Sequence, residues 1–168
     1  MKQAITGVVT SDVAEVEVRT IWPSICVYPS GRMLGRWFAI KWPDVYVFRL
    51  GNLLALLAIP HALALYFLRV SPYRALRYMV TNRRVCICRG LTAEVEKSID
   101  LDGFDAIEIQ VQDGQQWYYA ADLVFMKDGT EVFRLGAVTR PDVLRHSCLS
   151  VRQAMVSVRQ VRQQQACA

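Results

Sequence analysis

Residues 77–89, RYMVTNRRVCICR, point to the fold class, because two short β-prone runs flank a dipeptide that favours a tight turn. Residues 77–81 and 84–89 are rich in β-branched, aromatic and cysteine side chains. Asn82, which opens the turn between them, tolerates the left-handed backbone that tight turns require. The stretch therefore predicts a β-hairpin.

Two further pairs of β-like runs follow in the sequence. Residues 95–101 and 107–111 flank Asp102-Gly103 and alternate apolar with polar side chains, which predicts a second hairpin with one solvated face. Residues 123–127 and 131–135 flank Asp128-Gly129, a turn dipeptide of the most favourable kind, which predicts a third. Successive hairpins of this kind predict an antiparallel barrel or sandwich.

A single amphipathic helix is expected after these strands. Pro141 is tolerated in a first helical turn, and apolar residues then recur at spacings of four and three: Leu144, Cys148, Val151, Met155 and Val158. This stripe has to be buried, so we expect the helix to close the barrel. Residues 165–168 are expected to form a tail.

An apolar segment precedes the β-like region. Residues 50–68 contain no Asp, Glu, Lys or Arg, are bounded by Arg49 and Arg69, and match the ~20 residues that cross a hydrocarbon core. Pro60 near the middle can kink the helix, which leaves a single kinked span or a hairpin that returns to the same side. A buried core helix is the alternative. We favour a span with the C-terminal part in the cytoplasm, where unpaired cysteines belong.

The residues before this segment carry two weaker signals. Residues 8–19 alternate loosely, which indicates one exposed strand or an extended arm. Residues 22–43 combine three tryptophans with basic side chains, a composition typical of the membrane interface. Trp37, Trp42, Arg49 and Arg69 are the candidate interface residues, and a proline-punctuated loop packed on the globular part is the alternative.

Several of these residues together resemble a known family. The block Tyr78-x-x-Thr81-Asn82-Arg83-Arg84 follows an apolar segment, and Pro141-Asp142-Val143 opens the last helix. This pattern is similar to the bacterial PH-like domains found beside membrane helices, over residues 71–164. The resemblance implies a mostly β fold with α: a PH-like antiparallel barrel or sandwich of about seven strands, capped by one C-terminal helix and preceded by a transmembrane or membrane-hairpin helix. It also implies membrane attachment without a recognised catalytic activity.

The expected organisation is an N-terminal arm over 1–49, a membrane segment over 50–70, a PH-like domain over 71–164 and the tail. The expected location is the cell inner membrane, with the PH-like domain facing the cytoplasm. Arg83 and Arg84 in the first turn, with Arg74 and Arg77, are candidates for lipid head-group contact. The alternative is that the arginine pair is solvated or packs its stems on the barrel.

Charge and motif content bear on the other function classes. The net charge of +5 suits an anionic partner, but acidic residues interrupt the basic ones, which disfavours nucleic acid. His61 and His146 lie in different environments without a catalytic or metal-binding spacing. Cys86 and Cys88 are expected to be buried structural thiols. We therefore expect neither an enzyme nor a bound cofactor or metal.

The expected function is that of a membrane-anchored binding module. A scaffold or assembly factor for a membrane complex is the first reading, with membrane lipids and other membrane proteins or a second copy as partners. A sensor of anionic lipid head groups is the alternative. A thiol- or metal-dependent enzyme is the alternative from another class.

Overall fold

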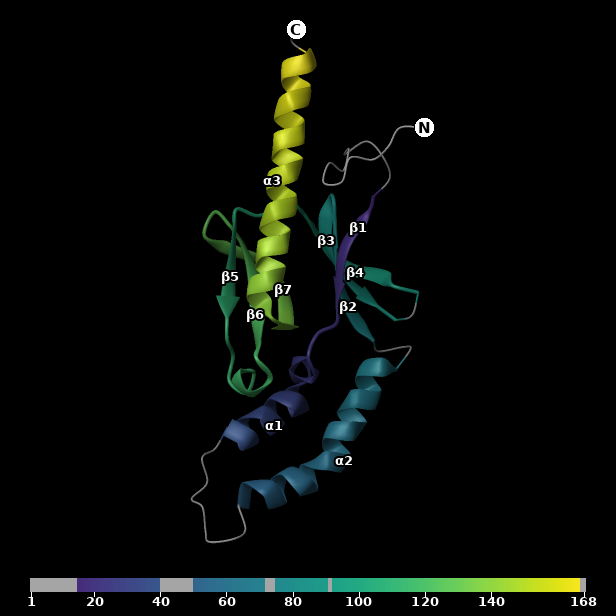
Figure 1. Cartoon of the computed structure of the whole chain (residues 1–168), viewed down its shortest axis with the longest axis vertical. Helices are drawn as coiled ribbons and strands as arrows, with labels where there is room; N and C mark the ends of the chain where they lie inside the picture. Colours follow the sequence, from purple (N-terminus) through teal and green to yellow (C-terminus); the bar gives the residue numbers. More distant parts are fainter. Residues whose placement is uncertain (1–14, 40–49, 72–74, 91, 167–168) are drawn as a thin grey trace.

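The computed structural model describes residues 15–39, 50–71, 75–90 and 92–166, in which seven strands form two antiparallel sheets (Figure 1). The first sheet has the order β1-β2-β3-β4 and the second the order β5-β6-β7. The strands are β1 (Glu17–Ile21), β2 (Leu76–Thr81), β3 (Arg84–Arg89), β4 (Glu94–Asp100), β5 (Ala106–Gln110), β6 (Ala120–Lys127) and β7 (Thr130–Thr139). The expected antiparallel two-sheet architecture with a C-terminal helix is confirmed.

Two of the three predicted hairpins are present. β2 and β3 pair around Asn82-Arg83, with Val80 opposite Val85, so both valines face the core. β6 and β7 pair around Asp128 and Gly129, whose φ angles of 50° and 75° provide the left-handed pair that a two-residue hairpin turn requires. The β6–β7 turn thus has the left-handed backbone that its sequence predicts, whereas Asn82 of the β2–β3 turn is not among the described residues with a positive φ.

The second predicted hairpin is wrong. β4 pairs with β3 and β5 pairs with β6, so the chain crosses from one sheet to the other between them. Leu101 and Phe104, on either side of Asp102-Gly103, are fully buried in the core. The burial of these two side chains between the sheets overrides the hairpin tendency of the Asp-Gly dipeptide.

The first sheet begins earlier in the chain than the sequence pattern indicates. β1 pairs antiparallel with β2, and Ile21 lies opposite Tyr78. An exposed strand or an extended arm was expected over residues 8–19. Residues 8–14 of this range lie outside the described residues, and from Glu17 the chain forms β1, an edge strand of the sheet. Two helices are therefore inserted between neighbouring strands, and a fragment starting at residue 71 would lack β1.

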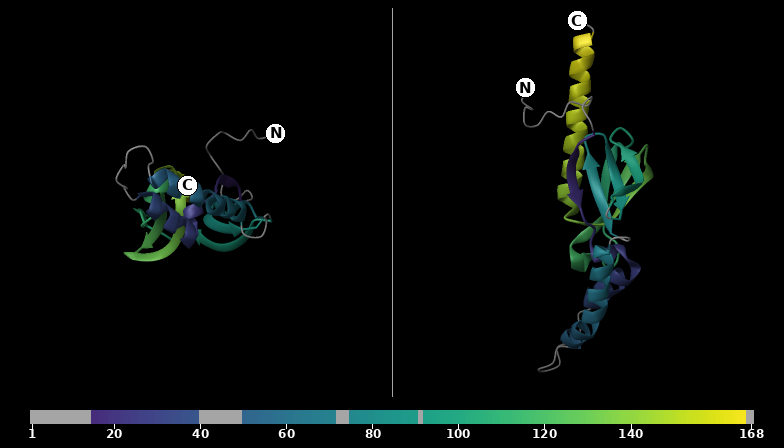
Figure 2. Two further views of the ribbon diagram at one scale, coloured as in Figure 1. Left: turned by 90° about the horizontal axis from the view of Figure 1, so that it is seen from below. Right: turned by 90° about the vertical axis from the view of Figure 1, so that its right-hand side faces the viewer.

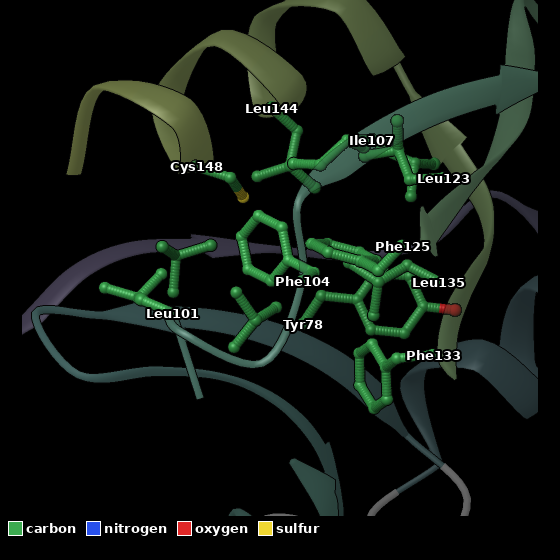
Figure 3. Close-up of a cluster of buried hydrophobic side chains, with 13 residues drawn as sticks. Tyr78, Leu101, Phe104, Ile107, Leu123, Phe125, Phe133, Leu135, Leu144 and Cys148 are labelled. Atoms are coloured by element: carbon green, nitrogen blue, oxygen red, sulfur yellow. The ribbon is translucent and has the colours of Figure 1, made fainter. Parts of the chain in front are cut away.

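One hydrophobic core joins both sheets and the last helix (Figure 3). Phe104 and Phe133 both pack edge-on against Phe125, with ring centroids 4.9 Å and 5.6 Å apart. From α3 (Pro141–Ala166), Leu144 and Cys148 complete this cluster. The predicted apolar stripe of the helix is thereby confirmed at Leu144 and Cys148, whereas Val158 is not among the residues packed against this core.

The far half of α3 extends beyond the sheets, as two views show (Figures 1 and 2). Val151 and Met155 still pack partly against the core, whereas Val156 is exposed. The helix continues to Ala166, so the tail expected from residue 165 is wrong at 165 and 166, and 167–168 lie outside the described residues.

The inserted helices are α1 (Pro29–Ala39) and α2 (Leu50–Val70). They lie beyond one end of the two sheets, opposite the end from which α3 projects (Figures 1 and 2). Short 3-10 helices, η1 (Ile25–Val27) and η2 (Gln116–Tyr118), lie next to α1. The helix predicted over 50–68 is present. Within the part of the chain whose side chains the structure describes, no helix is long and apolar enough to cross a membrane, so the transmembrane expectation is unsupported.

Candidate functional site

The two sheets have two distinct ends, which we name from their connections. The insertion end holds α1, α2 and the β3–β4 and β5–β6 connections, because β2 begins directly after α2. The turn end holds the β2–β3 and β6–β7 turns. The six residues of β2 separate the two ends by about 20 Å at ~3.3 Å per residue.

The predicted head-group residues divide between these ends. Arg83 and Arg84 lie at the turn end, whereas Arg77 lies at the insertion end, and Arg74 is outside the described residues. The Arg83 turn therefore lies the length of β2 away from the end of α2, because the strand runs away from that helix. The sequence placed these residues near one another, and the length of a strand separates them.

Arg84 is engaged within the protein. Its Nε and Nη2 atoms donate to both carboxylate oxygens of Glu15 at 2.8 Å and 2.7 Å. The hydrogen bonds from Arg84 hold the pKa of Glu15 below its usual value. Arg84 therefore fixes the chain segment before β1.

Asn82 and Thr81, the neighbouring turn residues, also bind the segment that leads into β1. Asn82 exchanges two hydrogen bonds with the backbone of Val16: its Oδ1 accepts from the Val16 N–H, and its own N–H donates to the Val16 carbonyl oxygen, both at 3.1 Å. The Thr81 hydroxyl accepts from the Arg84 N–H at 3.0 Å and donates to Glu15 at 2.8 Å. Side chains in a tight turn commonly satisfy local backbone groups in this way. The Thr-Asn-Arg-Arg block thus binds the N-terminal strand to the hairpin.

Arg77 also has partners inside the protein. Its Nη2 donates to the carbonyl oxygen of Gly90 at 2.6 Å, and its guanidinium lies 5.1 Å from the ring centroid of Trp22. A cation above an indole face is attracted by the ring quadrupole. The contact attaches the chain after β1 to the start of β2.

The predicted interface residues are partly described. Trp37 is exposed on α1, and Arg69 lies half-buried in the last turn of α2. Trp42 and Arg49 lie outside the described residues. Trp37 and Arg69 both lie at the insertion end.

α1 and α2 pack against each other through a small apolar cluster. Leu34 of α1 is buried with Ala58 and Leu65 of α2. Only this face of α2 is covered: large apolar side chains remain exposed on the rest of the described helix, namely Leu56, Leu57, Ile59, Leu63, Tyr66, Phe67 and Val70. Leu57 exposes 73% and Phe67 66% of its surface. Large exposed apolar side chains gathered on one helix are typical of an interaction site.

Two exposed aromatic residues at the same end were missed by the sequence analysis. Tyr119 is 87% and Trp117 is 54% exposed, and both lie at η2 in the β5–β6 connection. The ring of Trp117 lies 5.6 Å from that of Phe38 in α1. The sequence did offer a signal for these residues, because Trp117 to Tyr119 are three consecutive aromatic residues in a segment with turn composition.

A buried carboxylate fixes this connection. Asp122 Oδ1 accepts from the Gln115 amide at 2.6 Å and from the Ala137 N–H at 2.9 Å. Its Oδ2 accepts from Gln112 at 2.7 Å and from Arg134 at 3.1 Å. Four hydrogen bonds, one of them from the Arg134 guanidinium, compensate for the burial of this charge. We interpret the network as structural, because every partner is within the protein.

The network reaches α1 through backbone contacts and side chains. Arg32 Nη1 donates to the Gln112 side-chain oxygen at 2.7 Å. Gly114 has a positive φ of 84°, and a Cβ there would collide with the Arg32 carbonyl. The Tyr118 hydroxyl donates to the Gly31 carbonyl at 3.2 Å. α1 and the β5–β6 connection therefore pack together closely.

The predicted structural thiols are buried. Cys86 and Cys88 have almost no exposed surface, and burial raises the pKa of Cys86 to about 11 and also raises that of Cys88. Thiols with raised pKa values are poor nucleophiles at neutral pH. Among the described residues no group of His, Cys, Asp and Glu side chains could hold a metal ion.

Comparison of the chain with family models, curated proteins and solved structures finds no match.

Proposed function

We propose that this protein is a membrane-attached binding module with a PH-like fold, and that the α1–α2 insertion enters the bilayer and returns to the same side. The observation that carries the proposal is the exposed apolar face of α2, which includes Leu57, Leu63 and Phe67. Full transfer of one such side chain from water to an apolar phase contributes about 1.5–3 kcal/mol. Several partly exposed side chains on one helix therefore favour lipid over water.

The topology supports a return to the same side rather than a single span. β1 and β2 are neighbours in one sheet, and the chain between them leaves and re-enters the sheet at the insertion end. A single span between the two strands would place them on opposite sides of the membrane, which their hydrogen bonding forbids. The re-entrant hairpin, one of the two geometries open at the sequence level, is thus the favoured one.

The role that fits best is a scaffold for a membrane complex. Arg84 is held by Glu15, and the Arg83 turn lies at the far end of the sheets from the apolar helix. Both observations disfavour a head-group sensor built on these two residues. A scaffold requires only that the β domain and the projecting half of α3 are held above the bilayer, within reach of a membrane protein or a second copy.

Fractionation of the full chain tests the attachment. We expect the protein in the membrane pellet after detergent-free lysis, resistant to alkaline carbonate and released by detergent. Leu57→Asp with Leu63→Asp should move it to the supernatant, because two carboxylates on the exposed face oppose insertion. Val132→Asp, an equally apolar but remote exposed site on β7, is the matched control. Recovery of the unaltered protein in the supernatant would refute the proposal.

The geometry has its own test. In a Cys167→Ser background, single cysteines placed at Glu17 and at Lys97 should react equally with a membrane-impermeant reagent on sealed vesicles. These positions lie on β1 and β4 of one sheet. Labelling of one position with protection of the other would indicate a single span.

A further inference from the structure

We infer that the β5–β6 connection is a second membrane-contacting element, in which Trp117 and Tyr119 lie at head-group level of the bilayer that holds α2. The inference rests on the proposed function and adds a specific contact surface to it. We define the aromatic edge as Trp117 and Tyr119 of this connection together with Met33 and Trp37 of α1. All four side chains are exposed at the insertion end.

The chemistry of the edge suits an interface between lipid and water. Tryptophan and tyrosine combine a large apolar ring with one polar group, and they are enriched where one end of a side chain is apolar and the other is wet. A shallow depression of about 480 Å³ lies between the end of α1 and the connection. Ala39, Gln116, Trp117 and Tyr119 line it. Its lining thus combines apolar surface with an amide and a phenol.

The backbone at Tyr119 has an unusual conformation. Tyr119 has φ 49° and ψ 38°, the left-handed conformation that is unfavourable for a bulky residue. Such a conformation persists where the surrounding structure enforces it and is found preferentially at functional sites. Here the Tyr119 N–H donates to Gln116, and the next residue, Ala120, donates to Gln115, the residue anchored on buried Asp122.

Contacts between α1 and the β5–β6 connection hold the two parts of the aromatic edge together. Gly114 lies against the Arg32 backbone, and Arg36 approaches Asp113 at 3.8 Å. When α1 and α2 enter a bilayer together, the connection has to come with them. The aromatic edge therefore lies at the same end of the sheets as the exposed face of α2.

A bilayer fits this edge better than a protein partner does. Arg36 keeps 61% of its side chain exposed, next to the edge, where a basic group can meet anionic lipid. Its ion-pair partner Asp113, at 3.8 Å and with 85% of its side chain exposed, balances this charge, so the aromatic rings carry most of the lipid contact. Aromatic rings with a basic neighbour, presented on the same side as an apolar helix, form the composition of an interfacial anchor.

Vesicle partitioning of the full chain tests the inference. We expect Trp117→Asp with Tyr119→Asp to weaken partitioning into phosphatidylcholine vesicles containing phosphatidylglycerol by about tenfold, because two rings are replaced by charges. Asp tolerates the left-handed backbone at position 119, so the fold should persist, as circular dichroism would check. Val132→Asp should leave partitioning unchanged. Unaltered partitioning of the folded double variant would overturn the inference.

Fluorescence provides an independent measurement. A variant with Trp22→Phe, Trp37→Phe and Trp42→Phe retains Trp117 as its single tryptophan. On binding vesicles, its emission should be quenched by lipids brominated near the glycerol end and become shielded from aqueous acrylamide. If the protein binds but Trp117 stays accessible to acrylamide, the inference fails and the proposed attachment stands. If the protein does not bind at all, both fail. If the Trp117→Asp, Tyr119→Asp variant still partitions into vesicles but no longer copurifies with another protein, the edge binds a protein partner and the inference fails.

Discussion

The guanidinium of Arg84 binds both carboxylate oxygens of Glu15, at 2.8 Å and 2.7 Å, and so joins the β2–β3 turn to the chain segment before β1. Nearly seventy residues separate the two in sequence, a distance that the local motif does not reveal. The most specific block of the family resemblance therefore has a structural task here. Glu15→Gln should cost about 0.2–1 kcal/mol, the usual worth of a partly exposed ion pair, measured by urea unfolding at neutral pH.

The same pair sets a pH dependence. The pKa of Glu15 is lowered in the folded protein, chiefly by the hydrogen bonds from Arg84. Its contribution to stability is therefore present above the unfolded carboxyl pKa and is lost as pH falls through the folded value. The difference in stability between the native chain and Glu15→Gln should shrink on acidification from pH 7. A difference that is independent of pH would contradict the assignment.

A fragment that starts at residue 71 should be unstable. It lacks β1, so β2 would become an unpaired edge strand. The backbone groups around Tyr78, which lies opposite Ile21 in the full chain, would then be exposed. We expect aggregation or a clearly lower melting temperature than for the full chain, measured by circular dichroism. A fragment starting at residue 15 is the control, because it keeps every described strand. Equal melting temperatures for the two fragments would show that β1 is dispensable.

The sequence predicted those elements whose signals are local. Asn82 and Gly129 mark two hairpins, and the spacing of Leu144 and Cys148 marks the last helix. The hairpin predicted at Asp102-Gly103 was wrong, because Leu101 and Phe104 on either side of it are buried in a core formed by distant strands. The place of β1 is likewise a long-range pairing that no local pattern encodes.

The candidate site was predictable only where its residues carry a local sequence signal. Composition alone identified Trp37 and Arg69, because the whole region around the apolar helix is aromatic and basic. Trp117 and Tyr119 were missed, since only the fold brings the β5–β6 connection beside α1. Arg83 and Arg84 follow the apolar helix closely in sequence, but β2 lies between them and separates the turn from that helix.

The buried carboxylate of Asp122 should be the most sensitive polar position. Asp122→Asn removes the charge that compensates Arg134 and turns an amide donor toward the N–H of Ala137 or the amide of Gln115. We expect a loss of about 2–4 kcal/mol in unfolding free energy by urea titration. Glu131→Gln, which affects only the exposed partner of Arg134, is the control and should cost less than about 1 kcal/mol.

Cysteine reactivity should report the integrity of the core. Burial raises the pKa of Cys148 to about 12 and that of Cys86 to about 11, so both thiols stay protonated at pH 8. Since the thiolate is the reactive form, neither should react with an aromatic disulfide reagent in the native Cys167→Ser protein, and both should react once urea unfolds it. Leu144→Ala, which opens a cavity beside Cys148, should cost about 2–5 kcal/mol and speed labelling of that thiol.

Val143→Ala is the matched control for this last change, because its side chain lies one position along the same helix but faces solvent. It should leave both the stability and the labelling rate close to those of the native chain. Fast labelling of Cys148 in the native protein would mean that α3 detaches readily from the sheets. In that case the helix that closes the core could not also hold its projecting half at a fixed orientation for a partner, and the scaffold role would lose its geometric basis.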